Sequence, residues 1–266
     1  MKRKQLFSNP AEIAGIIILV VSALVFAVSP LAAIIIALFY ILLCFSACFF
    51  PQTNFLLPVI SRGQTGKNLV ALTFDDGPAE PTTRQVLDLL DNYSVKATFF
   101  VSVVNARRFP EIIKDIVSRG HSIGNHSYSH NPFLMLSSFN NLYREISDAQ
   151  EILQKMGINT QAFRPPVGIV NPKLSPILEK LGMFCVTFSC RAFDAGNLHV
   201  KDIASKILKK VKGDDIILLH DVPPRRKKDS EELLPEIDRL LTGIIAKGLR
   251  IVPLADLIGK EVMSNH

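Results

Sequence analysis

The sequence predicts an α/β fold, a distorted (β/α)7-type barrel, preceded by an N-terminal hairpin of two transmembrane helices. From about Leu69 onward, short β-rich runs alternate with longer segments of helical period, which is the pattern of a parallel sheet with crossover helices. From Ala11 to Phe50 the chain is almost continuously apolar, with Glu12 as the only charge. We therefore expect a membrane anchor over residues 1–60 and an α/β domain over residues 61–266.

The apolar segment contains two runs, 13–28 and 31–50, which are separated by Ser29-Pro30. Each run approaches the length of about 20 residues that spans a bilayer as a helix. A helical hairpin is the simplest interpretation. The alternatives are a signal peptide followed by one anchor, or a single long helix kinked at Pro30. The second run is too apolar to end in water, which favours the hairpin.

Basic residues lie at the outer ends of the pair of apolar runs, before the first run and after the second. Lys2, Arg3 and Lys4 precede the first run, Arg62 and Lys67 follow the second, and the connection between the runs carries no charge. Lys and Arg near the ends of spans are preferentially kept on the cytoplasmic side. We expect a multi-pass protein of the cell (inner) membrane whose α/β domain faces the cytoplasm, and a single span would invert this orientation.

The α/β domain contains about seven candidate strands and six candidate helices. The strands are Leu69–Phe74, Ala97–Ser102, Ser122–Asn125, Ala162–Arg164, Cys185–Ser189, Ile216–His220 and Arg250–Pro253. The helices are Thr82–Asn92, Pro110–Arg119, Leu142–Met156, Pro172–Leu181, Val200–Val211 and Glu231–Lys247. About seven strands joined by crossover helices favour a barrel over an open sheet.

Composition argues against a nucleic-acid partner. The net charge of +6 is modest, and Lys and Arg are scattered apart from 2–4 and 225–228. A nucleic-acid-binding face would need a basic stripe interleaved with aromatic side chains. The four cysteines have neither the spacing of a zinc knuckle nor that of a redox pair.

Unusual polar residues lie where the candidate strands end. In barrels of this kind, reactive groups sit at the carboxyl ends of strands, where loops vary without disturbing the core. The residues expected to converge on this rim are Asp75, Asp76, His126, Arg164, Asp194 and His220. The adjacent carboxylates are closed by Gly77-Pro78, and such a stretch alone is often only a solvated turn.

A second motif, His126-Ser127-Tyr128-Ser129-His130, carries two imidazoles at positions i and i+4. They meet one ion if the segment turns helically, as in other zinc sites. Two imidazoles and one carboxylate form a catalytic metal site with open coordination positions. Taken alone, this motif is equally compatible with ordinary surface or core histidines.

The third and fourth motifs are Arg164-Pro165-Pro166-Val167-Gly168 and Ile217-Leu218-Leu219-His220-Asp221. Prolines stiffen a loop, so a backbone amide there can be held to stabilise negative charge that develops on oxygen. A histidine at a strand end can supply a proton near neutral pH.

Together and in this order, the four motifs resemble the polysaccharide deacetylase family, the NodB homology domain of carbohydrate esterase family 4. The resemblance covers roughly Leu69 to Ile258, and it implies that 61–266 is a NodB-like catalytic domain. The implied activity is hydrolysis of a carbon–nitrogen bond other than a peptide bond. A metal-dependent enzyme of this kind removes an N-acyl group, most often N-acetyl, from an amino sugar.

The resemblance also implies a role for each motif residue. The metal ligands are Asp76, His126 and His130, and the metal is most often Zn²⁺, with Co²⁺, Ni²⁺ or Mn²⁺ as alternatives. Asp75 is the general base oriented by Arg164, and His220 is the acid whose pKa Asp194 raises. The implied oxyanion donor is the amide of Val167, and the implied substrate contacts are Pro165, Pro166 and Leu218.

Three departures from the family pattern put the identity of the substrate in doubt more than the type of reaction. Val167 stands where the family usually has tyrosine, which removes an aromatic wall of the pocket. Segment 190–195 has alanine where many members have tryptophan, and the chain contains no tryptophan. In the same segment, Arg191 stands where an acidic residue is frequent.

The expected anchor favours an amino sugar linked to a polyprenyl phosphate, with membrane lipid as a second partner. An enzymatic alternative is a deformylase that acts on a lipid-linked formamido sugar. A different class is a non-catalytic, membrane-tethered sugar-binding protein, which the retained metal ligands and base disfavour. The basic run 225–228 is either a solvated loop or a contact for a lipid phosphate.

Overall fold

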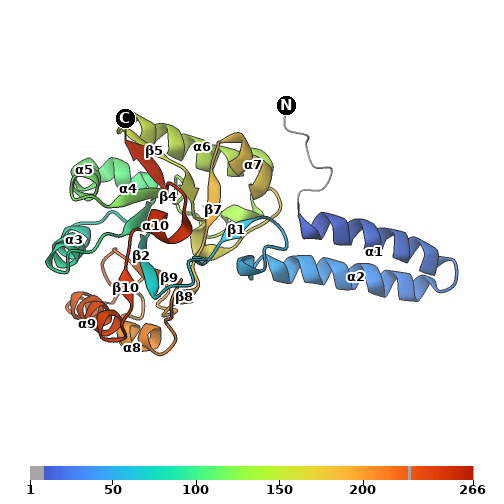
Figure 1. The fold of residues 1–266 in the computed structure, drawn as a ribbon. Helices are drawn as coiled ribbons and strands as arrows, with labels where there is room; N and C mark the ends of the chain where they lie inside the picture. Colours follow the sequence, from blue (N-terminus) through green and yellow to red (C-terminus); the bar gives the residue numbers. More distant parts are fainter. Residues whose placement is uncertain (1–8, 227–228, 266) are drawn as a thin grey trace.

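A computed structural model describes residues 9–226 and 229–265, and its α/β domain is a curled parallel sheet surrounded by helices (Figure 1). The main sheet follows the order β1-β7-β6-β4-β3-β2-β9-β8, with β10 also paired to β2. Its strands are β1 (Val59–Ile60), β2 (Leu69–Asp75), β3 (Thr98–Val101), β4 (Ser122–Asn125), β6 (Ala162–Phe163), β7 (Phe184–Val186), β8 (Cys190–Arg191), β9 (Ile216–His220) and β10 (Arg250–Ile251). A separate antiparallel pair joins β5 (Ile158–Thr160) to β11 (Met263–Asn265).

The sheet is an open half-barrel, because β1 and β8 are its two edges and no pairing joins them within the described residues. This architecture agrees with the predicted (β/α)7-type fold. The end of β1 and the residues after it contact the chain at the opening between β1 and β8. Ile60 accepts a hydrogen bond from the Thr187 amide at 2.9 Å, and Arg62 forms an ion pair with Asp215 at 2.6 Å.

All six predicted helices of the domain are present, with ends shifted by three residues at most. They are α3 (Thr82–Asn92), α5 (Pro110–Ser118), α6 (Phe139–Lys155), α7 (Leu174–Lys180), α8 (Ile203–Leu208) and α9 (Leu233–Ala246). The sequence did not predict the short helices α4 (Val103–Arg108) and α10 (Leu254–Ile258), nor the 3-10 turns at 51–53, 134–136 and 166–168.

The alternation of side chains along β2 places the site. Val70, Leu72 and Phe74 are fully buried in the helix-facing core, whereas Ala71 packs into a second cluster inside the curled sheet. Because side chains alternate between faces of a strand, Thr73 and Asp75 share the inner face with Ala71. Each fully buried Leu or Phe stabilises the fold by roughly 1.5–3 kcal/mol. The apolar register of β2 therefore aims its polar residues at the barrel interior.

The apolar N-terminal segment forms two helices, α1 (Pro10–Phe26) and α2 (Pro30–Ala47), which lie side by side and project from the domain (Figure 1). Ser29 caps α2 by accepting a hydrogen bond from the Ala32 amide, and Pro30 takes the first helical position. The hydroxyl of Tyr40 donates to the Ala11 carbonyl at 2.7 Å. This pairing rules out a single long helix kinked at Pro30.

The membrane topology stays a prediction. Of the helices in the described part of the chain, α2 alone has the length and apolar composition to cross a membrane, a property that a signal sequence near the N-terminus shares. Lys2, Arg3 and Lys4 lie outside the described residues. The boundary expected at residue 60 falls at the end of β1, which pairs in parallel with β7 of the domain.

Candidate active site

The structure brings the six polar residues together at one end of the half-barrel. Asp75 ends β2, His220 ends β9, and Asp76, His126, Arg164 and Asp194 follow the ends of β2, β4, β6 and β8. Neighbouring parallel strands all end at the same rim, so residues far apart in the sequence become neighbours.

The first group at this rim consists of Asp76, His126 and His130, whose candidate ligand atoms all lie within 4.8 Å of one another. The Nε2 atoms of His130 and His126 lie 2.8 Å and 3.5 Å from Asp76 Oδ1. Two imidazole nitrogens and one carboxylate oxygen form the donor set of a catalytic zinc site that keeps an open position. The chemistry and spacing of these residues therefore fit a divalent metal ion.

The segment that carries the two histidines is not helical, so the expected cause of their convergence was wrong. Ser127 and His130 have left-handed backbones, with φ of 71° and 55°. The Ser127 amide donates to Asn125 Oδ1 at 2.8 Å, and the His130 amide donates to Ser127 Oγ at 3.1 Å. A compact turn brings the two ring centroids to 4.8 Å.

Neighbouring groups hold the first two ligands in place. The Nδ1 atom of His126 lies 2.8 Å from the carbonyl oxygen of Arg164, a contact that leaves Nε2 for the metal. The carbonyl of Asp76 accepts hydrogen bonds from Asn105 and Ser102. Burial acts to raise the pKa of Asp76, but its contacts with His126 and His130 outweigh burial and hold the pKa far below its usual range. These contacts favour the carboxylate form of Asp76, which is the form that binds a metal ion.

Asp75 is positioned by Arg164, whose side chain is fully buried. Arg164 Nη1 donates to Asp75 Oδ1 and to Thr73 Oγ1, both at 2.7 Å, and Nη2 donates to the Thr187 carbonyl. The guanidinium carbon also lies 3.9 Å from the centroid of the Phe100 ring. One Asp75 oxygen is thereby occupied, while Oδ2 lies 3.7 Å from His126 Nε2 and faces the metal ligands.

His220 forms a buried pair with Asp194 near the ligand group. Its Nδ1 lies 2.7 Å from Asp194 Oδ2, which also accepts the Asn197 amide at 3.1 Å. Burial acts to lower the pKa of His220, but the hydrogen bond and charge of Asp194 raise it to about 9. The contact with Asp194 thus favours the protonated form of His220, which can donate a proton.

We expect Asp194→Asn to lower the pKa of His220, because the amide keeps a hydrogen-bonding atom but removes the negative charge. A general acid works only when protonated, so the alkaline limb of the kcat/KM profile moves to lower pH, by about 1–3 units. The pH dependence of acetate release measures this shift. Asp202→Asn, at an exposed position before α8, is the matched control, and an unshifted limb in Asp194→Asn would contradict the assignment.

Gly77 is required by the close approach of Asp221. The buried Asp221 carboxylate accepts the Gly77 amide at 3.1 Å and the Thr83 hydroxyl at 2.7 Å. A Cβ atom at position 77 would collide with both carboxylate oxygens. This contact gives the Asp-Asp-Gly-Pro motif a structural reason for its glycine.

Gly77→Ala is expected to lower the free energy of unfolding by about 1–3 kcal/mol, the usual cost of overpacking. Urea unfolding followed by circular dichroism measures the change. If the clash with Asp221 is the cause, adding Gly77→Ala to Asp221→Ala costs much less than adding it to the wild type. Equal costs in both backgrounds would refute this explanation.

The remaining predicted residues differ in their access to solvent. Pro165, Pro166 and Leu218 are buried, so their substrate contacts stay predictions. Val167 is 48% exposed and has a left-handed backbone with φ of 55°, which is rare for a β-branched residue. The loop 165–168 thus presents this residue at the surface.

Several residues that support the site were not predicted. Thr73 lies within the first motif, and its hydroxyl, two residues before Asp75, could have been predicted from the sequence to face the site. Asn105 and Asn197, which hydrogen-bond to Asp76 and Asp194, carry no sequence signal because each reaches its partner only in the folded chain.

Arg225, the first residue of the basic run 225–228, borders the site. A Cβ placed at Gly196 would lie 3.3 Å from Asp76 Oδ2 and 3.4 Å from Arg225 Nη2. Lys227 and Lys228 of the same basic run lie outside the described residues.

A parallel half-barrel with a His, His, Asp group and a second carboxylate at its rim defines a metal-dependent hydrolase. The polysaccharide deacetylase family model matches residues 62–186. A peptidoglycan-N-acetylglucosamine deacetylase of Bacillus cereus is 32% identical over 194 residues, which cover 72% of this chain and 89% of the relative. This chain therefore belongs to the polysaccharide deacetylase family, as the motifs predicted.

Other relatives extend the comparison. A chitooligosaccharide deacetylase of Sinorhizobium fredii is 29% identical and is matched over 73% of this chain and 94% of its own length. The crystal structure of a peptidoglycan N-acetylglucosamine deacetylase superposes with a TM-score of 0.69 at 30% identity, covering 77% of this chain and 94% of that chain. Some longer relatives are matched over only 42% of their length.

Proposed function

We propose that this protein is a metal-dependent deacetylase that hydrolyses the N-acetyl group of an amino sugar. The observation that carries the proposal is the placement of Asp75 and His220 beside the group formed by Asp76, His126 and His130. The relatives that this chain resembles are named as a peptidoglycan-N-acetylglucosamine deacetylase and a chitooligosaccharide deacetylase, which supports the same chemistry.

In this proposal each residue has one task. Asp76, His126 and His130 would hold a divalent ion, which when bound would polarise the amide carbonyl and make water more acidic. Asp75 takes a proton from the attacking water, because Arg164 fixes its position and leaves Oδ2 free.

The later steps of the proposed reaction use Val167 and His220. The amide of Val167 donates a hydrogen bond to the oxyanion that forms when water adds to the carbonyl carbon. His220 gives its proton to the sugar nitrogen as the carbon–nitrogen bond breaks, and acetate and a free amino sugar leave.

Acetate release tests the proposal directly. The purified full chain, loaded with Zn²⁺ in detergent, should release acetate from triacetylchitotriose or from a prenyl-phosphate-linked N-acetylhexosamine, and a chelator should stop the release. Absence of acetate from every amino sugar would refute it. Formate from a formamido sugar, without acetate from its acetamido counterpart, would favour the deformylase.

We also propose that the domain works at the cytoplasmic face of the inner membrane on a sugar carried by a polyprenyl phosphate. The paired apolar helices α1 and α2 and the basic residues that flank them support this side. A domain placed there reaches lipid-linked or soluble precursors but not an external polymer. A reporter fused after His266 tests the side, and activity outside the cell would overturn it.

A further inference from the structure

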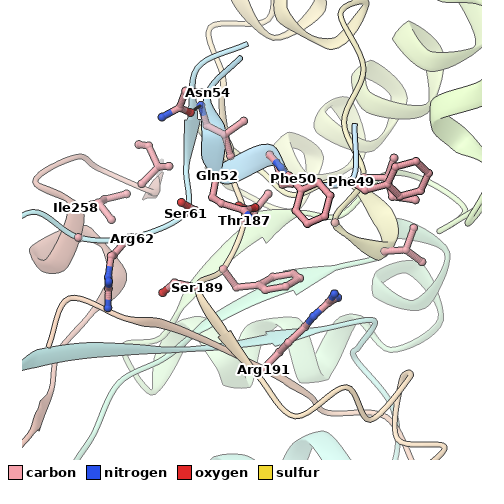
Figure 2. A pocket seen from close by; sticks show the side chains of 18 of the residues that line it. Phe49, Phe50, Gln52, Asn54, Ser61, Arg62, Thr187, Ser189, Arg191 and Ile258 are labelled. Atoms are coloured by element: carbon pink, nitrogen blue, oxygen red, sulfur yellow. Dashed lines mark hydrogen bonds between the residues drawn. The ribbon is translucent and has the colours of Figure 1, made fainter. Parts of the chain in front are cut away.

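A groove of about 1120 Å³ runs along the open seam of the half-barrel, between the end of the helical hairpin and the catalytic rim. Figure 2 shows Phe49 and Phe50 on one wall and Arg191 rising from the opposite wall. At the rim end the lining includes Val167 and Phe193. The groove therefore joins the point where the chain leaves α2 to the residues that surround the active site.

A backbone hydrogen bond fixes this arrangement, because the Val170 amide donates to the Cys48 carbonyl at 3.1 Å. Cys48 directly follows the last residue of α2, and Val170 lies three residues after Val167. The hairpin exit and the loop of the expected oxyanion donor are thus attached to each other. Phe49 and Phe50 directly follow and are 50% and 55% exposed, so they form an apolar entrance beside the hairpin.

The charges that line the groove all have one sign. Within the described part of the chain, its lining contains four basic side chains and no acidic one, namely Arg62, Arg191, Lys210 and Lys260. Arg62 is neutralised by Asp215 at 2.6 Å. Among residues 9–226 and 229–265, Arg191 and Lys210 form no direct ion pair with a carboxylate, although the charge of Asp194 acts on Arg191 from nearby. Their positive charge is therefore available to an anionic ligand.

Arg191 and Lys210 converge on one aromatic ring. The Arg191 guanidinium carbon lies 4.2 Å from the Phe193 ring centroid, and Lys210 Nζ lies 5.0 Å from the same centroid. Phe193 is 67% exposed and directly precedes Asp194, the partner of His220. Two cations are thus held near one exposed ring at the edge of the catalytic rim.

We propose that this groove binds the lipid carrier of the substrate, with its phosphate between Arg191 and Lys210 and its apolar chain along Phe49 and Phe50 toward the membrane. The inference rests on the proposed function for the identity of the sugar, but its binding chemistry is independent of turnover. A phosphate ester with a long apolar chain matches this lining, because the groove combines the basic side chains of Arg191 and Lys210 with the exposed rings of Phe49 and Phe50.

The test measures binding of farnesyl phosphate, a short prenyl phosphate, to the full chain in detergent by isothermal titration calorimetry. Farnesol and inorganic phosphate are the comparison ligands. We expect farnesyl phosphate to bind at least tenfold more tightly than either one. Arg191→Gln/Lys210→Gln should raise its Kd at least tenfold, whereas Lys209→Gln, which removes an exposed charge beside the groove, should leave it unchanged.

Other results would overturn the inference. The inference fails if the wild type does not bind farnesyl phosphate, or if it binds farnesol or inorganic phosphate as tightly as farnesyl phosphate. It also fails if Lys209→Gln raises the Kd for farnesyl phosphate as much as the double variant does. If the double variant does not fold, as judged by circular dichroism, Lys210→Gln alone should still raise the Kd severalfold, and an unchanged Kd would refute the proposal. Acetate release is measured separately. Binding of farnesyl phosphate without any acetate release would refute the proposed enzymatic function but would still support the proposed binding groove.

Discussion

Asp75→Asn is expected to reduce kcat for acetate release by about 10²–10⁴-fold, the usual contribution of a general base. The asparagine side chain has the same shape and can stay near Arg164, but it cannot accept the proton of the attacking water. The measurement is steady-state acetate release from triacetylchitotriose at saturating Zn²⁺. A sugar-binding protein without catalysis would keep its biological effect in this variant, which separates the two classes of function.

Two controls make the loss of activity specific to the base. Zinc content should stay at about one ion per chain, because Asp76, His126 and His130 are untouched. The thermal midpoint should be measured as well, since Arg164 is fully buried and loses its charged partner. Turnover within tenfold of the wild type in a folded, zinc-loaded variant would place the base elsewhere.

His130→Ala is expected to reduce zinc content to well below one ion per chain and acetate release by at least about 10²-fold, because one of three protein ligands is lost. His130 Nε2 lies 2.8 Å from Asp76 Oδ1, so its removal also leaves that carboxylate without its nearest partner. Metal analysis after dialysis and acetate release with added Zn²⁺ measure the two effects.

His199→Ala is the matched control for the metal ligand, because His199 is exposed and close in sequence to Asp194, but outside the ligand group. It should keep full zinc content and activity. A His130→Ala protein that retained one tightly bound zinc ion and full activity would contradict the proposed ligand set, as would an equal loss in His199→Ala.

The sequence predicted the parts of the fold that have a strong periodic signal. Strand β2 has seven residues and helix α3 has eleven, and both were located to within a residue. Strands β1 and β8 have two residues each, too few for any alternation to appear. Their existence depends on pairing with β7 and β9, which only the folded chain reveals.

The site shows the same division between local and tertiary signals. Asp75, Asp76 and His220 follow apolar strands, so their convergence could be predicted from topology. The turn between His126 and His130 depends on left-handed residues without glycine, which sequence spacing does not indicate. The groove beside Arg191 is lined by residues that follow α2, such as Phe49 and Phe50, and by Lys210, which follows α8. These residues are far apart in the sequence, so no local motif predicts the groove.

The parallel pairing of β1 with β7 has a practical consequence for anyone who wishes to study the enzyme without its helices. A truncated chain that begins at residue 61 would lack Val59 and Ile60 and would therefore expose the backbone edge of β7. Unpaired strand edges of this kind promote aggregation. Cleavage ahead of Asn54 would retain that strand together with the Asn54 side chain, which accepts the Val59 amide at 2.7 Å. The boundary between the α/β domain and the apolar helices thus lies several residues earlier than the expected boundary at residue 60.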